Sequence, residues 1–291
     1  MGRHAFLIIC HKSDYNLHAL IKSIDSEQGD IFLLVDKKAK SFDFQSVKSA
    51  AKFSNIIFVP RIKVVWGGYS LVKAEMVLFE FAKNYGEYEW YHLLSGVDMC
   101  IKSKNEFFEF FENKTDKIFI DFSNDPNWIA QAHDRIKYYR IQAGRNTFLA
   151  RLNKIYVMLQ KLLGVNRIKR IDFEITGGGQ WCSLPNSFVE YLITRKDWIR
   201  KVFRKSYCSD EIFMQTVVKN SEFYNNVYLS EDGVAYNMRH IDWTRGTPYV
   251  FNENDYEELL NSPAVFARKF TYSEDNKVVD MLLEHTGSNK Q

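Results

Sequence analysis

Residues 5–11 read Ala5-Phe6-Leu7-Ile8-Ile9-Cys10-His11, a continuous apolar run that ends in a polar side chain. Three further apolar runs follow at 31–35, 55–59 and 90–94. The segments 16–26 and 70–85 space their apolar residues three or four positions apart, as on one face of a helix. Continuous apolar strands that alternate with helices predict a mostly parallel sheet with helices on both faces. The expected fold class is therefore α/β, of the Rossmann type.

The composition is that of an ordinary globular protein. The chain has 291 residues, 46% hydrophobic and 26% charged, enough for one large domain or two small ones. Its net charge of +3, from 39 basic and 36 acidic residues, argues against a nucleic-acid partner. No window approaches the ~20 apolar residues of a membrane span. The apolar run at 5–11 is too short for a secretory signal.

The cysteines indicate a reducing compartment. Cys10, Cys100, Cys182 and Cys208 are far apart and form neither a C-x-x-C pair nor a Cys/His metal spacing. Disulfides are rare in cytosolic proteins, where thiols are kept reduced. We therefore expect four reduced thiols in a cytoplasmic protein.

A basic segment with a helical pattern interrupts the strand-helix alternation between residues 127 and 170. It carries ten cationic side chains: Arg135, Lys137, Arg140, Arg145, Arg151, Lys154, Lys161, Arg167, Lys169 and Arg170. Such a charge run is usually a solvated face. The alternative is an interface with anionic lipid or with a charged acceptor. The aromatic residues Trp128, Tyr138, Tyr139, Phe148 and Tyr156, which are interleaved with the cations, favour lipid.

Polar residues stand at the ends of the predicted strands. His11 follows the first, Val35 and Asp36 end the second, and Asp98 follows the fourth. In sheets of this class, ligands bind beyond the carboxyl ends of the strands. These residues therefore predict a site at one rim of the sheet. The alternative is that each polar side chain only caps a turn or a helix.

Three consecutive glycines occur in Thr176-Gly177-Gly178-Gly179-Gln180-Trp181. Glycines lack a Cβ and let the backbone come close to another surface or to a ligand. The segment is no phosphate loop, because it matches neither G-x-x-x-x-G-K-[ST] nor a G-x-G-x-x-G that opens a helix.

Seven segments in a fixed order carry a family resemblance. They are FLLVDKK at 32–38, WGGYSLVKA at 66–74, LSGVDMCIKS at 94–103, GQWCSL at 179–184, SDEIFMQT at 209–216, HIDW at 240–243 and FARKF at 266–270. Together they resemble the core-2/I-branching N-acetylglucosaminyltransferase and peptide O-xylosyltransferase family, glycosyltransferase family 14, in a bacterial-type member. The resemblance spans roughly residues 5 to 270.

The resemblance implies a GT-A-like fold, a UDP-sugar donor, inversion at the transferred sugar and no metal cofactor. The chain contains no D-x-D pair, and its nearest forms are 172–174, 253–255 and 255–257. The strand end that would carry such a pair holds Asp98 alone, which the resemblance directs to a sugar hydroxyl. The alternative is a metal-dependent enzyme of the same fold that uses Asp98.

The resemblance also assigns the two groups that such a transfer needs. Glu211 matches the family's catalytic glutamate and is the expected general base, with Asp210 beside it lining the acceptor. The alternative is that both carboxylates are favourable charges at a helix start. Arg268 and Lys269 match the run that contacts the diphosphate, and their apolar flanks imply burial against an anionic partner. Arg245 is a third candidate cation.

The remaining candidates follow from the same resemblance. Asp36, with His11 and Val35 beside it, is expected to meet the uridine of the donor. Gln180 and Trp181 are expected to line the donor or acceptor sugar, and the alternative for Trp181 is a buried core tryptophan.

We expect a single glycosyltransferase domain over 1–291. It comprises a nucleotide-sugar half at 1–123, a basic helical insertion at 124–170 and an acceptor and catalytic half at 171–291. The expected partners are a UDP-sugar, a glycan or lipid-linked oligosaccharide acceptor and an anionic membrane surface, with no cofactor besides the donor. The expected location is the cytoplasm, peripheral at the inner membrane face. The non-enzymatic alternative is an inactive module that binds sugars or nucleotides.

Overall fold

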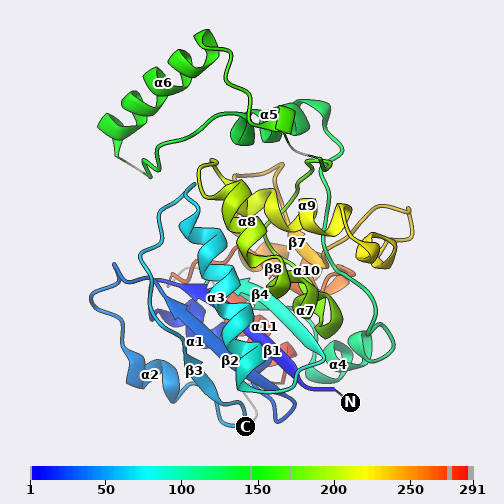
Figure 1. The fold of residues 1–291 in the computed structure, drawn as a ribbon. Helices are drawn as coiled ribbons and strands as arrows, with labels where there is room; N and C mark the ends of the chain where they lie inside the picture. The colour runs from blue at the N-terminus through cyan, green and yellow to red at the C-terminus, as the bar shows by residue number, and fades with distance from the viewer. Residues whose placement is uncertain (1, 145, 171, 274–276, 288–291) are drawn as a thin grey trace.

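A computed structural model describes residues 2–144, 146–170, 172–273 and 277–287 (Figure 1). The main sheet has five strands in the order β3-β2-β1-β4-β6, and a second sheet has three in the order β5-β8-β7. The strands are β1 (His4–Cys10), β2 (Gly29–Val35), β3 (Ile56–Phe58), β4 (Trp90–Ser95), β5 (Asp98–Cys100), β6 (Ser183–Pro185), β7 (Arg239–Ile241) and β8 (Phe266–Arg268). The helices are α1 (Tyr15–Ile24), α2 (Phe44–Lys48), α3 (Ser70–Tyr85), α4 (Lys104–Glu112), α5 (Pro126–Lys137), α6 (Thr147–Leu162), α7 (Asn186–Thr194), α8 (Lys196–Phe203), α9 (Phe213–Lys219), α10 (Tyr256–Asn261) and α11 (Val278–His285).

The four predicted strands form and pair in parallel. β1 lies between β2 and β4, and β3 extends the sheet beyond β2. The fifth strand, β6, pairs antiparallel with β4. β6 and the strands of the second sheet have three residues each and, unlike β3, lie outside the four continuous apolar runs that predict strands, so the sequence did not reveal them.

Both faces of the main sheet are covered, as the continuous apolar strands predict. Phe6 and Ile8 of β1 point into a core shared with α1, α4 and α11. Ala5 and Leu7 alternate with them and point into a second core, shared with α3, α7 and α9. The predicted α/β class, with a mostly parallel sheet flanked by helices, is confirmed.

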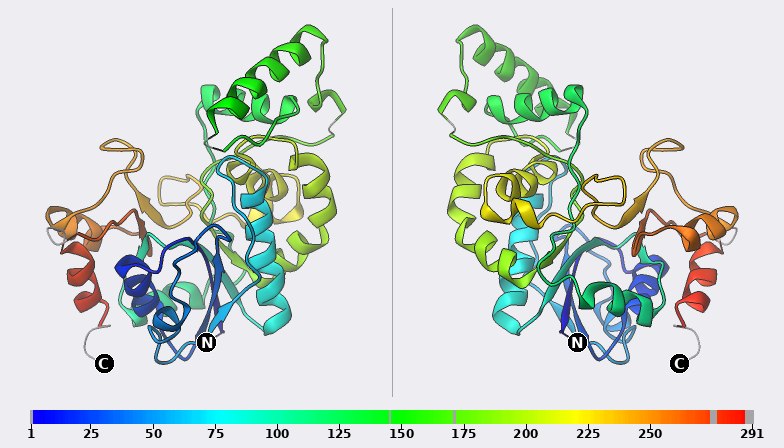
Figure 2. Two further views of the ribbon diagram at one scale, coloured as in Figure 1. Left: turned by 90° about the vertical axis from the view of Figure 1, so that its left-hand side faces the viewer. Right: turned by 90° about the vertical axis from the view of Figure 1, so that its right-hand side faces the viewer.

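The basic insertion projects from this body. Figures 1 and 2 show α5 and α6 at the end of the molecule opposite the N-terminus, and α5 is the nearer to the body. α5 packs through Ala132 and Ile136, which are fully buried. Among the described residues, no helix is long and apolar enough to cross a membrane.

A buried polar chain joins the two sheets. His4 Nδ1 lies 2.9 Å from His92 Nε2, and His92 Nδ1 lies 2.7 Å from Ser183 Oγ. Arg239, at the start of β7, donates to the same hydroxyl at 2.9 Å and to the carbonyl of Cys182 at 2.7 Å. Burial lowers the pKa of His4 to about 3 and the pKa of His92 well below its ordinary value. Both imidazoles are therefore neutral in the folded protein near neutral pH.

These histidines predict acid sensitivity of the fold. The unfolded imidazole titrates near 6.5, whereas the folded pKa of His4 is about 3, so the stabilisation is complete above 6.5 and is lost as the pH falls towards 3. We expect the free energy of unfolding, from urea titrations at a series of pH values, to fall across this window. His4→Gln should flatten the slope, whereas His285→Gln, at an exposed position, should keep it. Equal slopes in all three proteins would assign the acid sensitivity to other groups.

Candidate functional site

The three glycines lie against the backbone that carries the predicted base. The N–H of Gly178 donates to the carbonyl of Glu211 at 2.9 Å, and the N–H of Gly179 donates to Asp121 Oδ1 at 2.8 Å. A Cβ on Gly177 would lie 2.3 Å from the Glu211 carbonyl oxygen and 2.5 Å from the ring of Trp128. The close approach predicted for this segment is therefore to the protein's own backbone and to α5.

Glu211 ends a short 3-10 segment, η2 (Ser209–Glu211), which precedes α9. Its side chain is 40% exposed, and its Oε2 accepts a hydrogen bond from Nη1 of Arg135 at 2.6 Å. Arg135 comes from α5 and lies over the ring of Trp128 at 5.5 Å. The ion pair fixes the carboxylate, while Oε1 has no hydrogen-bond partner among the described residues. The sequence shows Arg135 only as one cation of the basic run, because 76 residues separate it from Glu211.

Two buried carboxyl groups lie beside this turn. Burial, with the charge of Glu211 as a second cause, raises the pKa of Asp210 to about 7. Burial, with the charge of Asp210 second, raises the pKa of Glu75 on α3 well above its ordinary range. Asp210 Oδ1 and Glu75 Oε2 have no hydrogen-bond partner among the described residues. Sequence reasoning missed Glu75, although a carboxylate between the apolar positions Val72 and Phe79 of one helix face is a usable signal.

Gln180 and Trp181 connect the buried carboxyl group of Glu75 to the predicted cation Arg268. Gln180 Nε2 donates to Glu75 Oε1 at 2.8 Å, and the guanidinium of Arg268 lies 4.2 Å from the centre of the Trp181 ring. The Cα atoms of Gly178 and Trp181 are at most about 11 Å apart, because the two residues are three positions apart in the chain. One short segment therefore touches both the base and the cation that the sequence predicts.

Arg268 is held by a buried carboxylate. Asp98 lies opposite Arg268 in the pairing of β5 with β8, and Arg268 Nη1 donates to Asp98 Oδ1 at 2.9 Å and to Ser95 Oγ at 2.8 Å. Asp98 Oδ2 accepts from the N–H of Ser95 at 2.8 Å. Burial raises the pKa of Asp98, against the opposing effect of the Arg268 charge.

The sugar contact expected of Asp98 stays a prediction, and the structure gives this residue a role of its own. Its side chain is 2% exposed and both its oxygens are already bonded, so Asp98 anchors Arg268. In the metal-dependent alternative, the guanidinium of Arg268 would have to leave Asp98 before a metal ion could bind there. The described residues contain no cluster of three or more His, Cys, Asp and Glu side chains suited to a metal ion.

The two other predicted cations differ in their surroundings. Lys269 is half-buried, and its ammonium makes no hydrogen bond or ion pair with any described residue. Arg245 is surrounded by the carboxylates of Asp242, Asp255 and Glu258, which raise its pKa. The structure thus pairs Arg245 with three carboxylates, and its expected role at the diphosphate stays a prediction.

The predicted uridine residues lie at the carboxyl ends of β1 and β2. Asp36 Oδ1 accepts from the N–H groups of Lys38 at 2.9 Å and Val64 at 3.3 Å, so this carboxylate closes the loop after β2. The side chain of Val35 is fully buried, which leaves only its backbone for a ligand. His11 is exposed just beyond β1.

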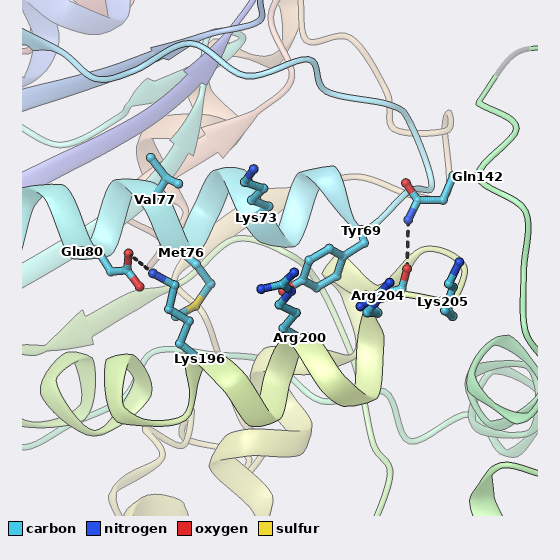
Figure 3. Close-up of a pocket in the computed structure, with 10 residues that line it drawn as sticks. All are labelled: Tyr69, Lys73, Met76, Val77, Glu80, Gln142, Lys196, Arg200, Arg204 and Lys205. Carbon is cyan, nitrogen blue, oxygen red and sulfur yellow. Dashed lines mark hydrogen bonds and ion pairs between the residues drawn. The ribbon is translucent and has the colours of Figure 1, made fainter.

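A basic groove of about 530 Å³ lies between α3 and α8 (Figure 3). Lys73 and Tyr69 line one wall, and Arg200 and Lys196 line the other. Lys196 is paired with Glu80 at 2.6 Å. The groove contains none of the residues predicted for the site, although α3 contributes both to the groove and, through Glu75, to the acidic group.

Comparison with known sequences identifies the family. The sequence model of the Core-2/I-Branching enzyme family matches residues 4–260. The chain belongs to this family, a family of glycosyltransferases. The family and the glycosyltransferase class predicted from the sequence are confirmed, as the mostly parallel α/β class is by the sheet topology.

The relatives by sequence are distant. Xylosyltransferase 2 of Canis lupus familiaris is 23% identical over 303 residues, which cover 97% of this chain and 33% of that protein. Beta-glucuronosyltransferase GlcAT14B of Arabidopsis thaliana is 24% identical over 291 residues, covering 97% of this chain and 62% of that protein. The chain thus spans about a third of the length of the xylosyltransferases that it matches.

The similar solved structures are also remote. The galactosyltransferase LgtC, in complex with donor and acceptor sugar analogs, has a TM-score of 0.42 at 10% identity and covers 98% of this chain and 95% of that chain. The bifunctional glycosyltransferase WbbM has a TM-score of 0.46 at 12% identity and covers 98% of this chain and 50% of that chain.

The contact between Gly177 and the Glu211 carbonyl predicts the effect of a substitution at Gly177. Gly177→Ala places a methyl group within 2.3 Å of the Glu211 carbonyl, so η2 must move away. We expect this core-type overpacking to cost about 1–3 kcal/mol of unfolding free energy and to reduce sugar transfer further than that loss explains. Gly86→Ala is the control, because its Cβ would meet only the Tyr88 side chain, at 3.3 Å or more. Full activity in Gly177→Ala would show that the position of Glu211 is unimportant.

Proposed function

We propose that this protein transfers a sugar, with inversion and without a metal, from a UDP-sugar to a hydroxyl group of a glycan acceptor. The observation that carries the proposal is the arrangement around residues 178–181. An exposed carboxylate, Glu211, is anchored at one end of this segment, and the cation Arg268 stacks on its other end. This is the pair of groups that a direct displacement at an anomeric carbon needs.

Each group has one task in the proposed step. The Glu211 carboxylate takes the proton from the acceptor hydroxyl while that oxygen bonds to the anomeric carbon. The bond between the anomeric carbon and the diphosphate oxygen breaks from the opposite face, which inverts the configuration. The electron pair leaves with UDP. Arg135 keeps Glu211 in place from α5 through its ion pair with this carboxylate, so we treat it as a positioning residue.

The cations are proposed to neutralise the departing diphosphate. Arg268 retains N–H donors beyond the Nη1 group that Asp98 and Ser95 share. Lys269 follows it directly and supplies an ammonium that no described residue engages. Fixed cations that meet the charge as it develops stabilise the transition state more than the substrate. This arrangement supports a leaving group that departs without a metal ion.

We also propose the cytoplasm as the place of action, with peripheral association at the inner membrane face and a lipid-linked oligosaccharide as acceptor. The supporting observation is the charge of the insertion, ten basic residues within 127–170. Basic side chains near an anionic membrane surface each contribute about 1 kcal/mol.

The general base is tested by Glu211→Gln, which keeps the shape and removes the basicity. We expect transfer to fall by about 10² to 10⁴-fold, while the increase in melting temperature caused by UDP is retained. Glu222→Gln, at an exposed position of the described structure, is the matched control and should transfer normally. Normal transfer by Glu211→Gln would remove the base from the mechanism.

The diphosphate site is tested by Lys269→Ala, assayed in EDTA. We expect UDP and UDP-sugars to bind about tenfold more weakly, because a charged hydrogen-bond donor is lost, and the thermal shift produced by UDP to shrink accordingly. Arg268→Ala is the poorer variant, since it leaves Asp98 buried without its partner and destabilises the fold. Lys219→Ala serves as the control, because Lys219 lies on α9 beside Glu174. Full activity of Lys269→Ala in EDTA would contradict the proposed leaving-group chemistry.

A further inference from the structure

Helix α6 presents a mixed face to the protein, with Val157 and Gln160 buried, and an apolar face to solvent. Gln160 Oε1 accepts from the N–H of Tyr139 at 2.8 Å, and Gln160 Nε2 donates to the carbonyl of Tyr139 at 2.8 Å. Asn153 Oδ1 accepts from the N–H of Ile141 at 2.9 Å. These amides attach α6 to the connection that follows α5. An amphipathic helix on a globular protein normally has the opposite orientation.

The exposed face is an uninterrupted apolar stripe. Its members recur at helical spacing and are between 38% and 77% exposed: Phe148, Leu152, Ile155, Leu159 and Leu162. Met158 and Leu163, also exposed, widen it. From Phe148 to Leu162 the stripe is about 21 Å long, at 1.5 Å per residue. Soluble monomers rarely expose so large a contiguous apolar patch, and such patches mark sites of interaction with proteins or membranes.

The charges around the stripe select its occupant. Arg151 and Lys154 are exposed on α6 beside the stripe, and Lys161 is exposed in its last turn. Residues 135–171 include ten Arg and Lys but no Asp or Glu. Two copies of this segment would repel each other, so a second copy of the chain is the poorer occupant. An apolar stripe bordered by cations is the pattern of a helix that lies in the interface of an anionic membrane.

We infer that α6 is a membrane-docking helix, which lies parallel to an anionic bilayer and inserts the Phe148–Leu162 stripe below the phosphate level. Its cations contact the lipid phosphates beside it. The inference rests on the membrane location proposed above and is independent of the transfer chemistry. α5 connects the docked helix to the site, because Arg135 of α5 pairs with Glu211. Docking would therefore hold the candidate base at a fixed distance from the membrane surface.

The test compares paired variants on vesicles. Co-sedimentation is measured with vesicles of phosphatidylglycerol and phosphatidylcholine, and with phosphatidylcholine alone. The apolar variant combines Phe148→Ser, Ile155→Ser and Leu159→Ser, which remove only exposed side chains and should leave the fold intact. Its matched control combines Leu229→Ser and Val234→Ser, which are similarly exposed in another loop. The charge variant, Lys154→Glu with Lys161→Glu, is matched by Lys48→Glu with Lys52→Glu near α2.

We expect the unaltered protein to bind the phosphatidylglycerol vesicles and the apolar variant to bind at least about a hundredfold more weakly, because three side chains no longer leave water. Each reversed lysine should weaken binding by about fivefold or more. Both control variants should bind normally. All variants should keep the thermal shift with UDP, so loss of docking and loss of the donor site are distinguished.

Insertion itself is read with a polarity-sensitive dye on Leu159→Cys, compared with Leu229→Cys. All four native cysteines are buried, so the introduced thiol is the reactive one. A blue shift on phosphatidylglycerol vesicles at 159 but not at 229 supports the inference. Equal pelleting of the apolar variant and its control, or sensitivity to charge alone, would overturn it. A third outcome would also overturn it: the unaltered protein is a dimer by light scattering and binds no vesicles, and the apolar variant is a monomer.

Discussion

The hydrogen bond from the N–H of Gly178 to the carbonyl of Glu211 is the constraint on which the candidate site depends. It forms only because residues 177–179 lack side chains, since a Cβ at 177 or 178 would lie 2.3 Å from a backbone oxygen. Once this contact is made, the next residues have little freedom. Gln180 reaches Glu75 and Trp181 stacks on Arg268. The arrangement of the candidate site is thus imposed by backbone packing.

The site is assembled from elements that belong to different parts of the fold. The carboxylates come from α3 and η2 beside the main sheet, whereas Arg268 and its anchor Asp98 come from the second sheet. The buried Arg239 joins these parts, because it starts β7 and donates to carbonyls of both Cys182 and Leu93. A change in how the two sheets pack would therefore alter the distance between base and cation, even where neither residue is replaced.

The sequence predicted the strands that have a clear apolar pattern, and it missed the side-chain partners that only tertiary packing brings together. β1, β2 and β4 are long apolar runs, so periodicity placed them correctly. The partner of Glu211 is 76 residues away, and no local pattern could reveal Arg135 in that role. Asp98 and Arg245 also have partners that the sequence did not reveal. Their residue types suit ligands, but tertiary packing had already given Asp98 a guanidinium and Arg245 three carboxylates. Side-chain chemistry alone cannot tell whether a charged group is available.

The positive and negative charges are unevenly distributed along the chain, although the net charge is small. Residues 135–171 hold ten of the 39 basic residues and no acid, so the rest of the chain has 29 basic residues against 36 acidic ones. The positive part is the projecting α5 and α6 unit (Figure 2), and the negative excess lies in the remainder of the chain. Such a molecule is oriented by the field of an anionic surface, which attracts one end and repels the other. Electrostatics would therefore bring α6 to the membrane first, before its apolar stripe makes contact, and would turn the body that carries the opposite charge away from the lipid.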